Sequence, residues 1–300
     1  MVPSARASVT VRHGDAGHLD DLEDGSVHLI VTSPPYPMIP QWDAAFRAQG
    51  ASDYEEMHDR LGAAWTQAYR VLVEGGLLAI VVGDALRRRE GEFRLWPNHA
   101  EVLSRTSALG FRPLPYVLWK KPTNRPNAFL GSGFLPPNAY VTLDCEFILL
   151  LRKGALRAYP RADPARYRSR FSRAERDRWF TQVWADVRGA SQRGETGRTG
   201  AFPAEIPARL IRMFSVEGET VLDPFAGTGT TLWEAARLGR RAIGYEWDPG
   251  IYARLAAESA RRGFTDRGAR RSGATRRPAR ANGARSPRSP GDANTRARQG

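Results

Sequence analysis

The four consecutive residues most clearly suited to a chemical role are Ser33-Pro34-Pro35-Tyr36. Neither proline has an N–H group, so the Ser33 hydroxyl and the Pro34 carbonyl can accept hydrogen bonds without a competing backbone donor. Two acceptors that lie close together suit an exocyclic amino group, which has two hydrogens to donate. Tyr36 adds an aromatic face on which a heterocyclic base could stack. On its own, the tetrapeptide is equally well explained as a turn with a packing tyrosine.

The segment 223–231, Asp-Pro-Phe-Ala-Gly-Thr-Gly-Thr-Thr, has the pattern of a glycine-rich turn between a strand and a helix. Its glycines let the backbone approach a ligand closely. The next predicted strand ends in Glu246, a carboxylate that suits the two hydroxyls of a ribose. Asp223, in front of the turn, suits a cationic group such as the amino group of an amino acid. Together these features fit an adenosine that is joined to an amino acid through a sulfonium.

The same residues disfavour two other nucleotide sites. A P-loop needs a lysine that reaches the phosphates, and this turn has none. The Gly-x-Gly-x-x-Gly pattern of dinucleotide sites needs a third glycine, where this chain has Leu232. Asp223 would also repel a pyrophosphate. A nicotinamide-dependent oxidoreductase is therefore a weaker interpretation.

The segments around both motifs predict strands that alternate with helices, which is typical of an α/β protein with a doubly wound, mostly parallel sheet. The strand in the apolar run 27–36 must end at Pro34, because proline cannot donate to a sheet ladder. Its loop then lies at the carboxyl end of a strand, where open α/β sheets bind ligands. The other predicted strands are 9–16, 77–82, 116–119, 141–151, the residues before Asp223, and 241–246. The predicted helices are 54–72, 96–108, 230–238 and one that Ser172 caps near Arg173.

The two motifs resemble those of the amino-group DNA methyltransferases that use S-adenosylmethionine. The catalytic motif of that family is Ser/Asp/Asn-Pro-Pro-Tyr, and its cofactor motif resembles the segment 223–231. The catalytic motif comes first here, as in the permuted β class. Further segments that resemble family elements are Gly14-Asp15-Ala16, 75–82, 118–122 and 202–207, which begins with Phe202-Pro203. The resemblance covers about residues 9 to 260 and is weakest over about 123–195.

This resemblance implies a class I methyltransferase fold, Rossmann-like and circularly permuted, with an inserted target-recognition region. It implies direct methyl transfer from S-adenosylmethionine to the amino group of a base that is flipped out of double-stranded DNA. Ser33 and Pro34 would accept the amino hydrogens while the base stacks on Tyr36. The implied catalytic residues are Ser33, Pro34, Pro35 and Tyr36.

The cofactor residues follow from the same resemblance. Asp223 would lie near the amino-acid end of the cofactor, Phe225 near its sulfur, Glu246 on the ribose hydroxyls and Asp15 at the adenine edge. The full set is Asp15, Phe202, Pro203, Asp223, Pro224, Phe225, Gly227, Gly229, Thr230 and Glu246.

The serine of the catalytic motif is similar to that of family members that methylate N4 of cytosine. Adenine N6 is the alternative target, and an RNA or a protein glutamine is an alternative substrate. A nucleic-acid-binding protein without activity is disfavoured because both motifs are intact. A cognate restriction endonuclease and a second copy of the chain are further partners that the resemblance allows.

The motifs divide the chain into four predicted parts. Residues 1–122 form the catalytic half, 123–200 the target-recognition region, 201–264 the cofactor-binding half and 265–300 a disordered basic tail. Within the second part, the stretch Arg157–Phe180 interleaves arginines with aromatic residues, a composition that suits contact with DNA. A solvated charged helix is the plainer interpretation of that stretch.

Composition agrees with a DNA-binding enzyme. The 300 residues carry a net charge of +13, much of it past residue 264, which favours a polyanionic partner. Neither a membrane span nor a signal peptide is evident, and the single cysteine fits a reducing cytoplasm. Cys145 lies in a predicted buried strand, so we interpret it as a core residue and not as the nucleophile that methylation at C5 of cytosine needs. Five scattered histidines imply no metal.

Overall fold

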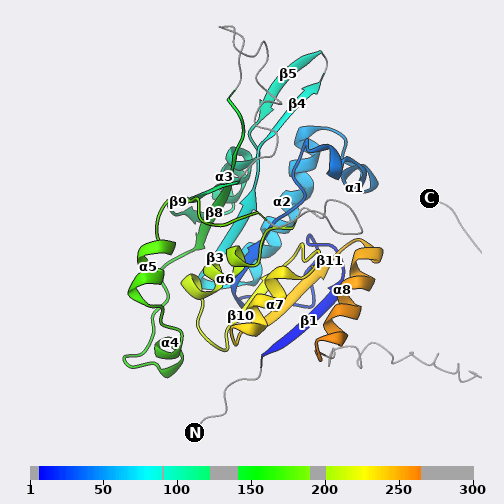
Figure 1. Cartoon of the computed structure of the whole chain (residues 1–300). Helices are drawn as coiled ribbons and strands as arrows, with labels where there is room; N and C mark the ends of the chain where they lie inside the picture. The colour runs from blue at the N-terminus through cyan, green and yellow to red at the C-terminus, as the bar shows by residue number, and fades with distance from the viewer. Residues whose placement is uncertain (1–6, 90, 122–140, 190–200, 265–300) are drawn as a thin grey trace, which may run out of the picture. The chain divides into compact units, whose positions relative to one another are not determined.

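The computed structural model describes residues 7–89, 91–121, 141–189 and 201–264 (Figure 1). The strands in these ranges are β1 (Ser8–His13), β2 (Val27–Thr32), β3 (Leu72–Val82), β4 (Ala85–Arg89), β5 (Glu92–Trp96), β6 (Phe111–Pro113), β7 (Val117–Lys120), β8 (Cys145–Lys153), β9 (Val183–Trp184), β10 (Thr220–Asp223) and β11 (Arg241–Glu246). The helices are η1 (Pro40–Trp42), α1 (Asp43–Ala48), α2 (Tyr54–Val71), α3 (Asn98–Ala108), α4 (Pro164–Arg168), α5 (Arg173–Trp179), α6 (Glu205–Phe214), α7 (Thr230–Arg237) and α8 (Pro249–Arg261).

A mostly parallel sheet organises these elements. Its strand order is β1-β11-β10-β2-β3-β8-β7-β9, and β6 pairs with β8 as well. The five strands from β1 to β3 run parallel to one another, whereas β8 is antiparallel to β3, β6 and β7. The early strand β2 lies between β10, a late strand, and β3. The predicted doubly wound, permuted α/β architecture is therefore confirmed.

Helices cover both faces of the sheet. Alternate residues of β3 divide between two buried clusters, with Leu78 and Ile80 in one and Leu77 and Ala79 in the other. Because side chains alternate across a strand, the two clusters lie on opposite faces. The first cluster includes Trp65 of α2, and helices α6, α7 and α8 supply residues of the second. The core thus consists of two layers with the sheet between them.

Most predicted elements are present with shifted ends. The helix expected over 54–72 is α2, which starts with a capping box of Asp53 and Glu56. The helix expected near Arg173 is α5, and Ser172 caps it. The strand from Val27 ends at Thr32, just before the Ser-Pro-Pro sequence. The long loop expected over 123–138 and the basic tail lie outside the described residues.

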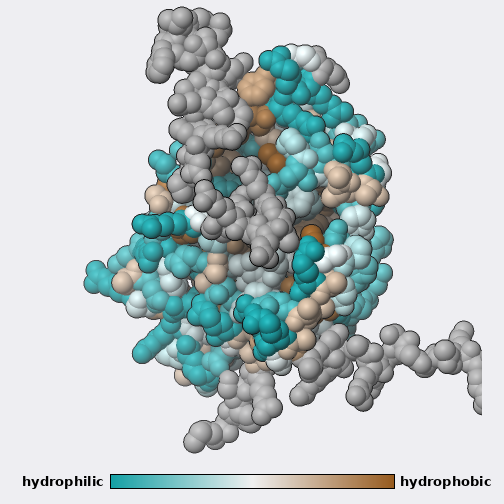
Figure 2. Space-filling model, turned by 45° about the vertical axis from the view of Figure 1, so that its right-hand side comes forward, coloured by the Kyte–Doolittle hydropathy of each residue, from teal (hydrophilic) through white to brown (hydrophobic). Residues whose placement is uncertain are grey.

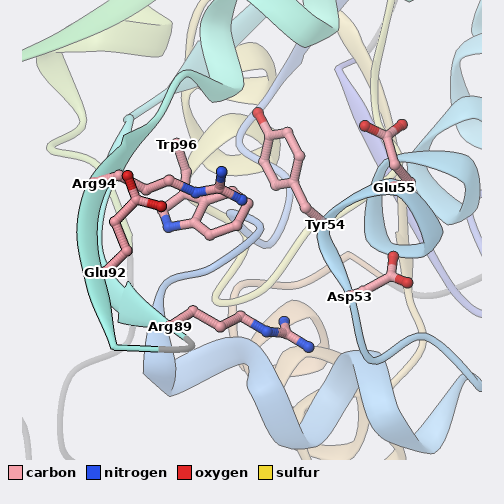
Figure 3. Close-up of a pocket in the computed structure, with 7 residues that line it drawn as sticks. All are labelled: Asp53, Tyr54, Glu55, Arg89, Glu92, Arg94 and Trp96. Carbon is pink, nitrogen blue, oxygen red and sulfur yellow. The ribbon is translucent and has the colours of Figure 1, made fainter.

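The β4–β5 hairpin is an element that the sequence did not predict. It starts directly after Asp84 and projects from the rest of the structure (Figure 1). Trp96, expected in a helix, ends β5, and the Arg94 guanidinium lies 3.9 Å from the centre of its ring. Beside the hairpin is a cavity of about 380 Å³, which the start of α2 also lines with Asp53, Tyr54 and Glu55 (Figure 3).

The described part of the predicted target-recognition region does not form a separate body. Strand β8 lies within the main sheet, and β9 adds a short strand beyond β7. The stretch Arg157–Phe180 starts at the edge of the sheet where the parallel strands begin. There Arg157 pairs with Glu219 at 2.6 Å, one residue before β10, and Arg168 pairs with Glu217 at 2.7 Å.

The surface of the described residues is mixed in character. Figure 2 shows one face, which is largely hydrophilic with small, separate apolar patches between the residues drawn in grey. No helix in the described ranges has both the length and the apolar character that a bilayer crossing needs.

Candidate functional site

The two sequence motifs meet at one point of the sheet. From β10 the chain moves to β11 on one side, and from β2 it moves to β3 on the other, so the strand order reverses between β10 and β2. Parallel α/β sheets bind ligands at such a switch point, beyond the carboxyl ends of the strands. Strand β2 leads into Ser33 and β10 leads into Pro224, so the catalytic and cofactor motifs leave the sheet side by side.

A buried hydrogen bond joins the two motifs. The Thr32 hydroxyl donates to Asp223 Oδ1 at 2.7 Å, and the backbone N–H of Phe225 donates to the same oxygen at 3.1 Å. The Thr231 hydroxyl, next to this carboxylate, donates to the Val31 carbonyl of β2 at 3.2 Å. Asp223 is 3% exposed, and burial raises its pKa to about 6. Asp223 thus fixes the catalytic strand against the glycine-rich turn, and its expected contact with the cofactor stays a prediction.

The glycine-rich turn has an open side and a packed side. Gly227 has a φ of +53° and Gly229 a φ of +83°, a left-handed backbone that favours glycine. A Cβ at Gly227 would come no closer than 3.9 Å to another group, so the backbone can be approached there. A Cβ at Gly229 would lie 2.7 Å from Trp233 and Leu255. The first glycine leaves room for a ligand, and the second lets α7 and α8 pack closely.

Glu246, at the carboxyl end of β11, faces this turn. Its Oε2 accepts a hydrogen bond from the Gly227 N–H at 2.9 Å, and its Oε1 accepts one from the Asp248 N–H at 2.8 Å. Each carboxylate oxygen keeps a further lone pair. Burial raises the pKa of Glu246. The residues therefore fit a ligand with two neighbouring hydroxyls, such as a ribose, over the open side of Gly227.

The remaining predicted cofactor residues surround the same edge. Asp15 follows β1, which pairs with β11, and its Oδ1 accepts a hydrogen bond from the Gly17 N–H at 2.9 Å. Phe225 is half-buried, with its ring 6.2 Å from that of Trp65. Phe202 is buried in the core shared with α7, and the half-buried Pro203 follows it, just before α6. Pro224 is buried, and Thr230 begins α7.

The catalytic loop contains a chain of hydrogen bonds that ends in an ion pair. The hydroxyls of Ser33 and Tyr36 lie 3.0 Å apart, and the Tyr36 hydroxyl donates to Glu146 Oε2 at 3.2 Å. The other oxygen of Glu146 pairs closely with Lys121. Burial, followed by the charge of Glu146, raises the pKa of Tyr36 well above its ordinary value. Pro34 is buried, and Pro35 is half-buried.

The loop rests on the end of β3. A Cβ at Gly83 would lie 3.2 Å from both the Tyr36 ring and the Glu146 side chain, so only glycine gives these two groups their present positions. The Asn98 amide donates to the Pro37 and Gly83 carbonyls, each at 3.0 Å. Asn98 therefore holds the catalytic loop against the end of β3.

Several residues of this site were not predicted from the sequence. Thr32, Thr231, Glu146 and Lys121 all contact a predicted site residue or its partner. Glu146 could have been noticed, because a carboxylate in the apolar strand 145–151 needs a partner when it is buried. Cys145, expected in the core, is instead half-buried at the start of β8, where its thiol contacts Asp144. The basic stretch 157–180 starts at the opposite edge of the sheet, where Arg157 pairs with Glu219.

No group of three histidine, cysteine, aspartate or glutamate side chains in the described ranges could hold a metal ion.

Comparison with solved structures defines the class of fold. The chain is similar to TTHA0409 of Thermus thermophilus, a putative DNA modification methylase, with a TM-score of 0.69. That structure was solved in complex with S-adenosyl-L-methionine. The likeness covers 84% of this chain and 93% of that one at 38% identity. The cytosine-N4-specific PvuII DNA methyltransferase has a TM-score of 0.61 at 19% identity, over 84% and 86% of the two chains. The chain therefore has a class I methyltransferase fold.

Comparison of sequences adds the family. Residues 27–258 match the model for N6 and N4 methyltransferases, which is described as "DNA methylase". The chain belongs to this family of DNA methylases. The type II methyltransferase M.MjaI of Methanocaldococcus jannaschii is 49% identical over 81% of this chain and 89% of its own length. M.MthZI of Methanothermobacter thermautotrophicus is 40% identical over 78% and 71%.

Proposed function

We propose that this DNA methylase transfers a methyl group from S-adenosylmethionine to the N4 amino group of a cytosine in double-stranded DNA. One observation carries the proposal: the Thr32–Asp223 hydrogen bond sets the Ser-Pro-Pro-Tyr loop beside the glycine-rich turn at the switch point. The acceptors for an amino group therefore lie next to the backbone that suits an adenosine. The serine of the motif supports cytosine N4.

The cofactor is S-adenosylmethionine, which supplies an electrophilic methyl group on a sulfonium. The open side of Gly227 and the free lone pairs of Glu246 fit its ribose. The structure of TTHA0409 contains the same molecule. Asp15 at the adenine edge and Phe225 near the sulfur complete the proposed contacts, and both lie on the segments that border the turn.

The target base must leave the duplex, because the stack hides its amino group from a pocket of this kind. Ser33 Oγ and the Pro34 carbonyl then accept the two amino hydrogens, which turns the nitrogen lone pair towards the methyl group. The nitrogen lone pair forms a bond to the methyl carbon while the carbon–sulfur bond breaks and its electron pair stays on sulfur, and the cationic nitrogen then loses one proton to water. Orientation of this kind can contribute several kcal/mol to catalysis.

The type II names of the two archaeal relatives support a role in restriction and modification. A cognate endonuclease, a homodimer and a target-recognition role for residues 123–200 remain parts of the proposal.

The direct test is to methylate duplex DNA with the purified chain and to identify the modified nucleoside by mass spectrometry. We expect N4-methylcytosine. A product of N6-methyladenine would correct the target and leave the DNA methylase assignment in place. RNA and peptide substrates are assayed in parallel, and methylation of either one in preference to DNA would reject the proposal.

Ser33→Ala tests the proposed role of the loop. It should lower the rate of a single turnover by about 10²-fold, because one of the two acceptors that orient the amino group is lost. Binding of S-adenosylmethionine, measured by calorimetry, should stay unchanged. Equal loss of binding and turnover would contradict the division between the catalytic loop and the cofactor turn.

A further inference from the structure

Glu146 is a charged residue in an apolar strand, and the methyl transfer proposed above gives it no role. It is the second residue of β8, its side chain is 14% exposed, and Phe147 and Ile148 follow it. Lys121 pairs with its Oε1, and the Lys121 ammonium also lies 4.8 Å from the centre of the Trp119 ring. Both oxygens of Glu146 thus serve as acceptors, one for the Lys121 ammonium and one for the Tyr36 hydroxyl, and a carboxylate has no hydrogen to donate.

This acceptor determines the direction of the hydrogen bonds that follow. The Tyr36 hydroxyl has one hydrogen, and it goes to Glu146 Oε2 at 3.2 Å. Tyr36 must then accept in its second hydrogen bond, the 3.0 Å contact with Ser33. The Ser33 hydrogen therefore points to Tyr36, and the Ser33 oxygen is left with lone pairs alone.

The opposite direction would be harmful in the proposed reaction. If Tyr36 donated to Ser33, the Ser33 hydrogen would be free to point towards the substrate. It would then oppose the amino hydrogens that Ser33 is proposed to accept. Two hydroxyls alone have no preference between these directions, whereas a fixed carboxylate at one end imposes one.

The packing keeps the chain of contacts in place. The Tyr36 ring and the Glu146 side chain both lie against the backbone of Gly83, at the end of β3. Glu146 lies opposite Trp119 in the pairing of β7 with β8. Three strand segments, β3, β7 and β8, thus position the groups.

We propose that Glu146, held by Lys121, is a positioning residue that makes the Ser33 hydroxyl a pure acceptor for the amino group of the target base. The inference rests on the proposed function, because it assigns the acceptor to an amino substrate. It places a residue of β8, 110 positions further along the chain than Tyr36, in control of the catalytic serine.

The variant Glu146→Gln tests this proposal. Its amide can donate as well as accept, so the direction of the hydrogen bonds is no longer imposed, although the side chain keeps its size. We expect kcat on duplex DNA to fall by about 10-fold, with an unchanged KM for S-adenosylmethionine. The matched control is Asp144→Asn, which removes a charge two residues away, on a carboxylate that is 41% exposed and pairs with Lys120 at 3.9 Å. The control should keep the wild-type kcat.

A second measurement needs neither DNA nor cofactor. 3,5-Difluorotyrosine placed at position 36 gives a single ¹⁹F signal and titrates at lower pH than tyrosine. Glu146 and, behind it, Lys121 are the charged groups that the structure places next to this phenol. Removing the Glu146 charge should lower the midpoint of the titration by about one unit or more, whereas Asp144→Asn should leave it in place.

The two measurements separate failure of this inference from failure of the proposed function. Wild-type kcat in Glu146→Gln, or an unmoved ¹⁹F midpoint, would overturn the role of Glu146 while DNA methylation stands. A wild-type chain that methylates no DNA would overturn the proposed function and, with it, the acceptor role of Ser33. A lower kcat together with a lower midpoint would support the inference.

Discussion

At the scale of single residues, Asp223 and Glu146 are both carboxylates in apolar surroundings. Asp223 lies at the glycine-rich turn, and Glu146 lies beside the Ser-Pro-Pro-Tyr loop. Asp223 collects hydrogen bonds from Thr32 and Phe225 and joins two motifs. Glu146 receives one from Tyr36 and orders the catalytic loop. The two motifs could be found from the sequence because each one is contiguous, and the ligand contacts of their residues stay predictions. The sequence did not predict the Thr32–Asp223 and Tyr36–Glu146 hydrogen bonds, because both join segments that lie more than a hundred residues apart.

The pKa of Asp223 gives a prediction about stability. Burial raises it to about 6 in the folded chain, above the ordinary value near 4, so the folded state binds an extra proton between these values. The stabilisation that this extra bound proton gives to the folded state is therefore present at low pH, and it is lost as the pH rises through this window. Relative to Asp223→Asn, the wild-type free energy of unfolding should fall by about 2 kcal/mol from about pH 4 to pH 7. Urea unfolding of both chains at several pH values measures the difference, and parallel curves would contradict the assignment.

At the scale of elements, local sequence patterns located most strands and helices and indicated a mostly parallel sheet, but they did not indicate the antiparallel direction of β8. The helix over 54–71 and the strand that stops before Pro34 follow from periodicity and from the missing proline donor. The basic stretch after β8 was expected at the DNA. It starts at the edge opposite the two motifs, because β8 runs antiparallel to β3 and returns the chain there, and its contact with DNA stays a prediction. The direction in which a strand pairs depends on tertiary contacts, and the pattern of hydrophobic residues along the chain does not indicate it.

The glycine-rich turn gives a prediction at this scale. Gly229→Ala combines a left-handed backbone with a clash against Trp233 and Leu255, so it should destabilise the fold by about 2–4 kcal/mol and weaken cofactor binding. Gly50→Ala is the matched control, because Gly50 has a φ of +79° with nothing within 4 Å of a Cβ. It should cost only about 1 kcal/mol. Urea unfolding compares the two variants, and equal losses would show that packing at Gly229 does not matter.

At the scale of the whole molecule, the net charge is unevenly divided. Residues 265–300 contain ten arginines and two aspartates, so they carry +8 of the total of +13 and leave +5 for residues 1–264. The ion pairs along 157–178 use several of the arginines in the rest of the chain. Composition therefore indicated a polyanionic partner without indicating which surface meets it. That surface depends on the three-dimensional arrangement of the pairs.

Removal of residues 265–300 tests the contribution of this charge. If these arginines bind phosphates, the slope of log affinity against log salt should become shallower by about 0.9 for each phosphate that is no longer neutralised. Fluorescence anisotropy with a labelled duplex over a salt series measures the slope. A full-length chain with the ten arginines replaced by glutamine separates the effect of charge from that of length. An unchanged slope in both would show that this segment does not bind DNA.

The pairing of β1 with β11 has a consequence for the way the protein is made. Arg12 and Tyr245, neighbours across these strands, are 233 residues apart, so a ribosome releases β1 long before its partner exists. At about 5–20 residues per second, the wait is on the order of 10–50 s, during which the valines of β1 have no sheet to join. The Glu246 carboxylate also emerges at the end of this interval. A nascent chain that stops before residue 223 therefore holds the serine loop without the glycine-rich turn, and both β10 and β11 must be made before the two motifs can meet.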